Sequence, residues 1–130
     1  DGVKFYNDSI ASSPSRTIAG LRSFSEKVIL IAGGYDKHIP YDVLGPEIAA
    51  HVRLLVCTGA TGPKIAAAAR AFRMRRRSSK FRISMRPFTP LRSRQSPAIS
   101  CCCPRQAPPL TASRNFMVRG AEFKKTVMAL

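Results

Sequence analysis

The first 70 residues alternate between short apolar runs and stretches whose apolar residues recur at helical spacing. The run "VKFYNDS" is rich in β-forming residues and ends in polar residues that favour a turn. The next stretch, "SSPSRTIAGLRSF", places Pro14 where a helix can begin. Its apolar residues Ile18, Leu21 and Phe24 recur at the spacing of one helix face. The opening of the chain therefore predicts a strand followed by a helix.

The same alternation continues to residue 72. "KVILIAGG" is a continuous aliphatic run closed by two glycines, which is typical of a strand buried on both faces of a parallel sheet. "YDVLGPEIAAHV" predicts a helix, "RLLVCTG" another buried strand, and "TGPKIAAAARAF" a helix that opens with Thr61 and Pro63. Strands alternating with helices predict an α/β domain with right-handed crossovers. Ligands bind such sheets at the carboxyl ends of the strands, which here are "NDS", "GGYDK" and "TGATG".

Charge divides the chain into two unlike parts. The 130 residues carry 22 Lys and Arg against 7 Asp and Glu, a formal net charge of +15. Residues 1–70 hold eight basic and six acidic residues, whereas residues 71–130 hold fourteen and one, so the net charges are +2 and +13. The second part also holds the run "RMRRRSSKFR" and three of the four cysteines. The two parts do not have the composition of one domain.

Signals for membrane insertion are missing from the sequence. No segment approaches the roughly 20 apolar residues that span a bilayer, and no basic-then-apolar signal sequence opens the chain. We therefore expect no membrane partner. The first residue is Asp1 rather than Met, which leads us to expect a piece of a longer protein.

The stretch "ISCCCPRQAPPLTASRNF" is hard to reconcile with a functional site. Zinc sites usually use cysteine pairs separated by at least two residues, whereas Cys101, Cys102 and Cys103 are adjacent. We also expect no disulfides here, because the cysteines are adjacent and the chain shows no secretion signal. The arginine run could be an RNA-binding arm, because clustered basic side chains neutralise phosphates, but it lacks interleaved aromatic residues that stack on bases. Nucleic acid is therefore only an alternative partner, and no metal ligand is expected.

Three strand-end motifs together carry a resemblance to a known family. "FYNDSIASSPSRTIAGL", "VILIAGGYDKHIPYDVLGPEI" and "LLVCTGATGPKI" are similar, in this order and at suitable spacing, to the start of the C-terminal domain of Mur ligases, in the branch that adds D-glutamate. The similarity covers nearly all of residues 2–70. It implies an α/β fold with a Rossmann-like, mostly parallel sheet and flanking helices.

The end of the chain resembles the family again, and the middle does not. "NFMVRGAEFKKTVMAL" fits the family's final helix in register, whereas residues 71–114 do not fit. Codons can be chosen for "RQSPAISCCCPRQAPPLTAS" whose reading from a shifted base gives "AKPGDILLLSPASASFDRF", the family motif that is missing at this place.

We therefore interpret residues 1–70 as the first half of the domain, residues 71–114 as a basic Pro/Arg-rich segment translated out of frame, and residues 115–130 as the terminal helix. On this interpretation the middle of the sheet is corrupted. Proline- and arginine-rich sequence cannot bury the apolar area of the strands and helix it replaces. The isolated chain is then expected to be at best partly folded.

The resemblance implies a fragment of a cytoplasmic, ATP-dependent ligase of peptidoglycan synthesis. In the family, ATP phosphorylates the carboxylate of UDP-N-acetylmuramoyl-L-alanine, and the amine of D-glutamate attacks the acyl phosphate to form an amide. ATP and Mg²⁺ are bound mainly by a central domain, and "GATGPK" lacks the G-x-x-x-x-G-K-[ST] pattern of a phosphate-binding loop. This chain alone is therefore expected to be inactive, and we assign it no catalytic residue.

Four residues match family positions that contact ligands. Asp8 resembles an acidic residue that contacts the nucleotide, although a carboxylate capping the next helix would look the same. Ser12 resembles a hydroxyl near the D-glutamate carboxylate, or is simply a cap or turn hydroxyl. Lys37 resembles the lysine that pairs with the amino acid's side-chain carboxylate, although a solvated loop lysine would look the same. Asp36 either orients Lys37 or makes the turn. Phe116 resembles an aromatic beside the substrate, although an ordinary helix-face aromatic fits as well.

Two positions depart from the family pattern. Residue 10 is Ile where some members have lysine, which puts a second charged contact in doubt. Pro109 stands where the serine of the "SASF" motif would fall, so that substrate contact is absent from the chain as written.

Overall fold

The computed structural model describes residues 4–75, 81–85, 98–101 and 116–128. Strands and helices alternate along most of the chain. The elements are β1 Phe5–Asp8, α1 Pro14–Arg22, β2 Val28–Gly33, α2 Leu44–His51, β3 Val52–Thr58, α3 Gly62–Arg75, β4 Arg82–Ser84, β5 Ala98–Cys101 and α4 Phe116–Met128. The strands and helices predicted within the first 72 residues are all present, with bounds that differ by a few residues from the predicted ones.

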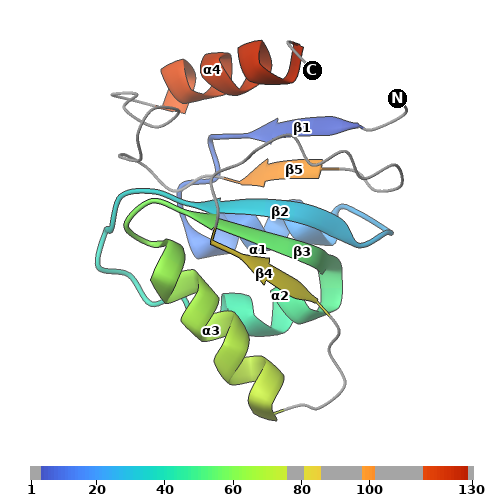
Figure 1. Ribbon diagram of the computed structural model, residues 1–130, viewed down its shortest axis with the longest axis vertical. Coiled ribbons are helices and arrows are strands. Elements are labelled where there is room, and N and C mark those ends of the chain that lie inside the picture. The colour runs from blue at the N-terminus through green and yellow to red at the C-terminus, as the bar shows by residue number, and fades with distance from the viewer. Residues whose placement is uncertain (1–3, 76–80, 86–97, 102–115, 129–130) are drawn as a thin grey trace.

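The five described strands form one sheet in the order β1-β5-β2-β3-β4 (Figure 1). All four strand pairings are parallel. The longest ladder joins β2 to β3, from Val28 opposite Val52 to Gly33 opposite Thr58. Because the strands are parallel, their carboxyl ends lie at the same edge of the sheet. The predicted α/β class, with a parallel sheet and flanking helices, is confirmed.

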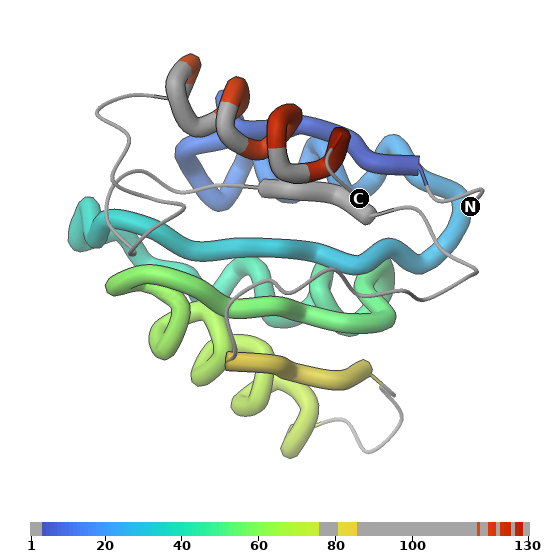
Figure 2. Tube along the Cα trace, turned by 45° about the horizontal axis from the view of Figure 1, so that its top comes forward, coloured from blue at the N-terminus to red at the C-terminus, as the bar shows by residue number. Residues whose placement is uncertain are grey.

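The main hydrophobic core lies between the sheet and the helices α1, α2 and α3. Figure 2 shows these three helices behind the strands, with α4 in front at the β1 end of the sheet. The largest core side chains are at most 1% exposed, and burying each one stabilises the fold by about 1.5–3 kcal/mol. They include Leu21, Leu30, Ile48, Leu55 and Ile65.

Strand β2 is buried on both faces, as its aliphatic sequence predicts. Leu30 belongs to the main core, whereas its neighbour Ile29 joins Val56 of β3 in a smaller cluster. Ile29 is 4% exposed and Val56 is 2% exposed. Because neighbouring residues of a strand point to opposite faces, the two clusters lie on the two faces of the sheet.

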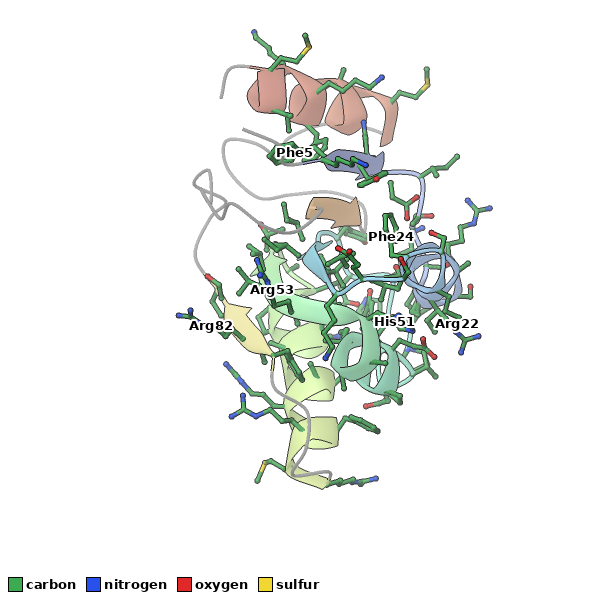
Figure 3. The ribbon with its side chains drawn as sticks, turned by 90° about the vertical axis from the view of Figure 1, so that its right-hand side faces the viewer. Phe5, Arg22, Phe24, His51, Arg53 and Arg82 are labelled. Atoms are coloured by element: carbon green, nitrogen blue, oxygen red, sulfur yellow. The ribbon has the colours of Figure 1, made fainter. Side chains whose placement is uncertain are left out.

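An ion pair ties α1 to α2 on the surface. Arg22 ends α1, and its guanidinium donates to both carboxylate oxygens of Glu47, with Nε–Oε2 at 3.1 Å and Nη2–Oε1 at 2.5 Å. This bond lowers the pKa of the Glu47 carboxyl. His51, one turn further along α2, lies 3.6 Å from the same carboxylate. Figure 3 shows Arg22 and His51 over the helical face of the sheet.

Two short strands come from the basic segment. β4 pairs with β3, and β5 fills the gap between β1 and β2. The expected corruption of the middle of the sheet therefore does not interrupt the ladder at Ala98–Cys101. A parallel ladder uses main-chain N–H and C=O groups, and these four residues include no proline to interrupt them. Helix α3 also runs into this segment, as far as Arg75.

Helix α4 packs beside β1, at the opposite end of the sheet from α3 (Figure 1). Asn7 of β1 donates from Nδ2 to the carbonyl oxygen of Gly120 at 2.9 Å. The rings of Phe5 and Phe123 meet edge to face with centroids 6.5 Å apart, and Figure 3 shows Phe5 between β1 and α4. The predicted terminal helix is therefore attached to the first strand of the chain.

Candidate functional site

Three loops gather at the carboxyl edge of the sheet. They are residues 9–13 after β1, residues 34–43 after β2 and residues 59–61 after β3. The loops continue the motifs "NDS", "GGYDK" and "TGATG" that the sequence singles out. Since ligands of open parallel sheets bind at this edge, these loops define the candidate site.

Glycines let the second and third loops touch through their backbones. Gly33 has a φ of +140°, and a Cβ there would lie 1.7 Å from the carbonyl oxygen of Thr58. Gly59 has a φ of +65°, and its Cβ would lie 2.8 Å from the Cα of Gly34. The Thr61 N–H donates to the carbonyl oxygen of Gly34 at 3.0 Å. Only glycine permits this close approach, which joins the two loops into one unit.

Lys37 and Ser12, the two candidates for binding the amino acid, meet across the first and second loops. The Lys37 ammonium donates from Nζ to the carbonyl oxygen of Ser12 at 3.5 Å, although the residues are 25 positions apart. The Ser12 N–H donates to the carbonyl oxygen of Ile10 at 2.8 Å, which places Ser12 in a tight turn before α1. The contact with Lys37 uses the main-chain carbonyl of Ser12 and leaves the assignment of its hydroxyl as a prediction.

Asp36 makes a turn and an ion pair with a residue other than Lys37. Its Oδ1 accepts a hydrogen bond from the His38 N–H at 2.9 Å, and its Oδ2 pairs with the ammonium of Lys64 in α3. The hydrogen bond from Lys64 is the largest cause of the lowered pKa of the Asp36 carboxyl. Of the two roles considered for Asp36, its contacts show the turn. Within the part of the chain that the structure describes, they include no direct bond to Lys37.

Asp8 ends β1 and packs against α1. A Cβ on Gly20 would lie 2.9 Å from Oδ2 of Asp8, so the carboxyl group packs closely against this glycine. Burial raises the pKa of this carboxyl group. The alternative in which Asp8 caps α1 is not what the structure shows, because Ser13 occupies the N-cap position. The role of Asp8 toward a nucleotide stays a prediction.

Phe116 begins α4, and its side chain lies outside the described part of the structure. The first turns of α4 approach the loop after β1. A shallow pocket of about 290 Å³ lies between them, lined by Asn7, Ser9, Ile10, Met117, Gly120, Ala121 and Lys124. The backbone of Phe116 is therefore near the loop that carries Ser12, at the same edge of the sheet. Its contact with substrate stays a prediction.

Lys64 is the residue at this edge that the sequence reasoning missed. The motif "GATGPK" lacks the pattern of a phosphate-binding loop, and its sequence alone gives Lys64 no other role. In the structure, the N–H of Thr61 bonds to Gly34 and the ammonium of Lys64 pairs with Asp36. These groups face another loop of the same protein. A signal was present, because a lysine in the first turn of a helix opposes the helix dipole and suggests a partner outside the helix.

The fold and this edge define a class of protein. An open parallel sheet with charged and hydroxyl-bearing loops at the carboxyl ends of its strands is typical of α/β domains of the Rossmann-like type, in which ligands bind at this edge. The described ranges contain no group of three or more His, Cys, Asp or Glu that could hold a metal ion. Among the helices that the structure describes, none is long and apolar enough to cross a membrane.

Comparison with curated proteins identifies the relatives of this class. The chain is 75% identical over 65 residues to the UDP-N-acetylmuramoylalanine--D-glutamate ligase of Acetivibrio thermocellus and 66% identical over 65 residues to that of Clostridium novyi. Each match covers 50% of this chain and 14% of the relative. The enzyme of the same name from Clostridium botulinum is 39% identical over 139 aligned positions, which cover the whole chain and 29% of that relative. No protein-family model matches.

The chain is therefore homologous to part of the UDP-N-acetylmuramoylalanine--D-glutamate ligases, and the resemblance to this branch of the Mur ligases is confirmed. It spans between 14% and 29% of the length of these relatives. The matches to the Acetivibrio thermocellus and Clostridium novyi enzymes extend over half of the chain, whereas the alignment to the Clostridium botulinum enzyme covers all of it at 39% identity.

Proposed function

We propose that this chain is a fragment of the ATP-dependent ligase that joins D-glutamate to UDP-N-acetylmuramoyl-L-alanine, and that it supplies the part that holds the incoming amino acid. The names of the relatives support the reaction class. The observation that carries the assignment to amino-acid binding is the 3.5 Å contact between Lys37 Nζ and the Ser12 carbonyl oxygen. It joins the two substrate candidates at the carboxyl edge of the sheet.

On this proposal, this part of the enzyme would bind D-glutamate and orient its amine. In the proposed reaction, the amine of D-glutamate attacks an acyl phosphate, the carbon–nitrogen bond forms, phosphate leaves and the amine loses a proton. An ammonium held beside a loop carbonyl suits the side-chain carboxylate of the amino acid, because charge-assisted hydrogen bonds are the stronger ones. Lys37 would hold that carboxylate, and the hydroxyl of Ser12 and the ring of Phe116 would border the bound molecule.

The described residues do not fit the phosphates of ATP or a Mg²⁺ ion. In the loop of residues 59–61, the N–H of Thr61 already donates to the carbonyl oxygen of Gly34. The ammonium of Lys64, which follows this loop, is already paired with Asp36. We therefore assign ATP and Mg²⁺ to the remainder of the intact ligase, with Asp8 as the contact of this chain with the nucleotide. The chain alone is then expected to be inactive. As part of the same proposal, we assign the intact ligase to the cytoplasm, because its substrate is a nucleotide-linked sugar precursor.

Titration of the ¹⁵N-labelled chain with D-glutamate tests amino-acid binding. D-Glutamate should shift the amide signals around Ser12 and Lys37, and D-glutamine should do so much less, because it lacks the side-chain carboxylate. Lys37→Met should weaken binding about tenfold or more, the loss expected for one hydrogen bond to a charged group. Lys4→Met is the matched control, since Lys4 precedes the amino end of β1. Equal affinity for D-glutamate and D-glutamine would contradict the proposal that Lys37 holds the side-chain carboxylate.

We further propose that residues 71–114 are translated out of frame. The matches at 75% and 66% identity each cover only 50% of the chain, which supports this. So does the place of β5, because Ala98–Cys101 is where the shifted reading restores the aliphatic "DILL". Resequencing the genomic DNA across codons 60 to 120 tests it. One added or missing base near each end should restore "PGDILLLSPASASFDRF", and an unchanged frame would contradict the proposal.

Nucleic-acid binding is the second candidate function, and one observation favours it. Residues 52–85 contain no Asp or Glu, and Arg53 and Arg82 lie along the β3–β4 end of the sheet (Figure 3). Arg70 and Arg73 of α3 are also exposed. Fluorescence anisotropy with a labelled single-stranded RNA should then show affinity that falls steeply with added salt. No binding at low salt would eliminate this function.

A further inference from the structure

The loop that carries Lys37 is held from its far side by α3 and the loop before it. The carbonyl oxygen of Gly34 accepts the Thr61 N–H at 3.0 Å and lies 3.4 Å from the Thr61 hydroxyl. Thr61 is fully buried. This attachment fixes the start of the loop, three residues before Lys37.

A second attachment lies directly next to Lys37. The side chain of Asp36 is 20% exposed, and its carboxylate accepts hydrogen bonds from two donors, the His38 N–H at 2.9 Å and the ammonium of Lys64. His38 has a φ of +56°, which a non-glycine residue rarely adopts without support. The two bonds of Asp36 therefore hold the backbone on both sides of Lys37, while the Lys37 side chain reaches toward Ser12 on the opposite side.

Lys64 is unfavourably placed for its own helix. It lies in the first turn of α3, where no acidic residue is present, and a cation at this end opposes the helix dipole. The carboxylate of Asp36 supplies the negative charge that this end of a helix favours. The ion pair between Asp36 and Lys64 therefore offsets the unfavourable interaction of Lys64 with the helix dipole. It joins the loop after β2 to the first turn of α3, and its partners are 28 residues apart.

We infer that Lys64 is a positioning residue, which acts through Asp36 to hold Lys37 where it can pair with the carboxylate of an acidic amino acid. The inference rests on the proposed function and deepens it. Lys64 does not touch the substrate. Lys64 instead favours one conformation of the loop in the unbound chain. Binding then does not carry the entropic cost of ordering the loop and the Lys37 side chain.

This role predicts an effect on binding with little effect on folding. The Lys64 side chain is 52% exposed, and exposed ion pairs contribute little to stability. Lys64→Gln should leave thermal unfolding almost unchanged while it weakens D-glutamate binding about three- to tenfold, the cost of ordering a rotamer-rich side chain and its loop. Lys64→Arg keeps the charge and should restore affinity to within about twofold of the original chain.

The experiment uses the full 130-residue chain and the D-glutamate titration with four variants: Lys64→Gln, Lys64→Arg, Lys37→Met and the charge-matched control Lys4→Gln. Lys4→Gln should bind as the original chain does. If Lys37→Met loses binding and Lys64→Gln does not, the positioning role is wrong and the proposed function stands. If Lys37→Met retains binding, the proposed function fails and the positioning role fails with it. Loss in Lys64→Gln without rescue by Lys64→Arg would also overturn the inference.

Discussion

Gly33→Ala should strongly destabilise the β2–β3 ladder beneath the site. At a φ of +140°, alanine adopts a conformation that costs about 1–3 kcal/mol. Its Cβ would also lie 1.7 Å from the carbonyl oxygen of Thr58, so that the two strands must separate. Overpacking of this kind adds about 1–3 kcal/mol. The combined loss of about 2–6 kcal/mol is a large part of the 5–15 kcal/mol that stabilises a typical domain.

Native-state hydrogen exchange measures this loss without requiring the whole chain to unfold in one step. The amides of Leu30 and Leu55, at the centre of the ladder, should exchange about 30-fold faster or more in Gly33→Ala, since each 1.4 kcal/mol is a factor of about ten. Gly62→Ala is the matched control. Gly62 lies in helix α3, and a Cβ there would lie 3.3 Å from the carbonyl carbon of Cys57. Gly62→Ala should therefore change the free energy of unfolding by less than about 1 kcal/mol. Unchanged protection in Gly33→Ala would refute the reasoning.

Three further predictions follow from burial and composition. Burial raises the pKa of the Asp8 carboxyl, so the stability that this group contributes is complete below its unfolded pKa and is lost as pH rises through the folded value. Asp8→Asn should therefore raise the melting temperature at pH 7 and change little near pH 3; a lower value at pH 7 would contradict this. Burial also raises the pKa of the Cys57 thiol to about 11, so that only about a thousandth is thiolate at pH 8. Iodoacetamide should label Cys57 far more slowly in the native chain than in urea, as followed by peptide mass mapping, and equal rates would show that the thiol is not buried. Thermal unfolding followed by circular dichroism should be broad, because residues 71–114 are rich in proline and arginine, which bury little apolar area. One sharp transition would show a cooperatively folded chain.

The sequence predicted the fold wherever apolar pattern decides the structure. The run "VILIAG" is typical of a strand buried on both faces, and β2 has that role. The limits of elements were less well predicted, because α2 passes directly into β3 at Val52 without a turn residue between them. β5 was not predicted from the residues as written, because Ala98–Cys101 has a weak strand pattern and its place depends on main-chain pairing with β1 and β2.

The site was predicted in part for a similar reason. Motif position was enough to nominate Lys37 and Ser12, which the structure brings into contact. It could not find the ion pair of Asp36, because the partner, Lys64, is 28 residues away in the sequence. Contacts between loops depend on the approach of whole elements, and no local pattern of residues encodes that approach.

The position of β5 has a consequence for the order in which the chain can fold. β1 pairs only with β5 among the described strands, and Phe5 is opposite Ala98 in that ladder. β1 must therefore wait for residues more than ninety positions later in the chain before the hydrogen bonds of this ladder can form. Pairing at such sequence separation is slow, because a long loop must close first. During that wait β1 presents an open strand edge, which makes the newly synthesised chain a target for aggregation and for chaperones.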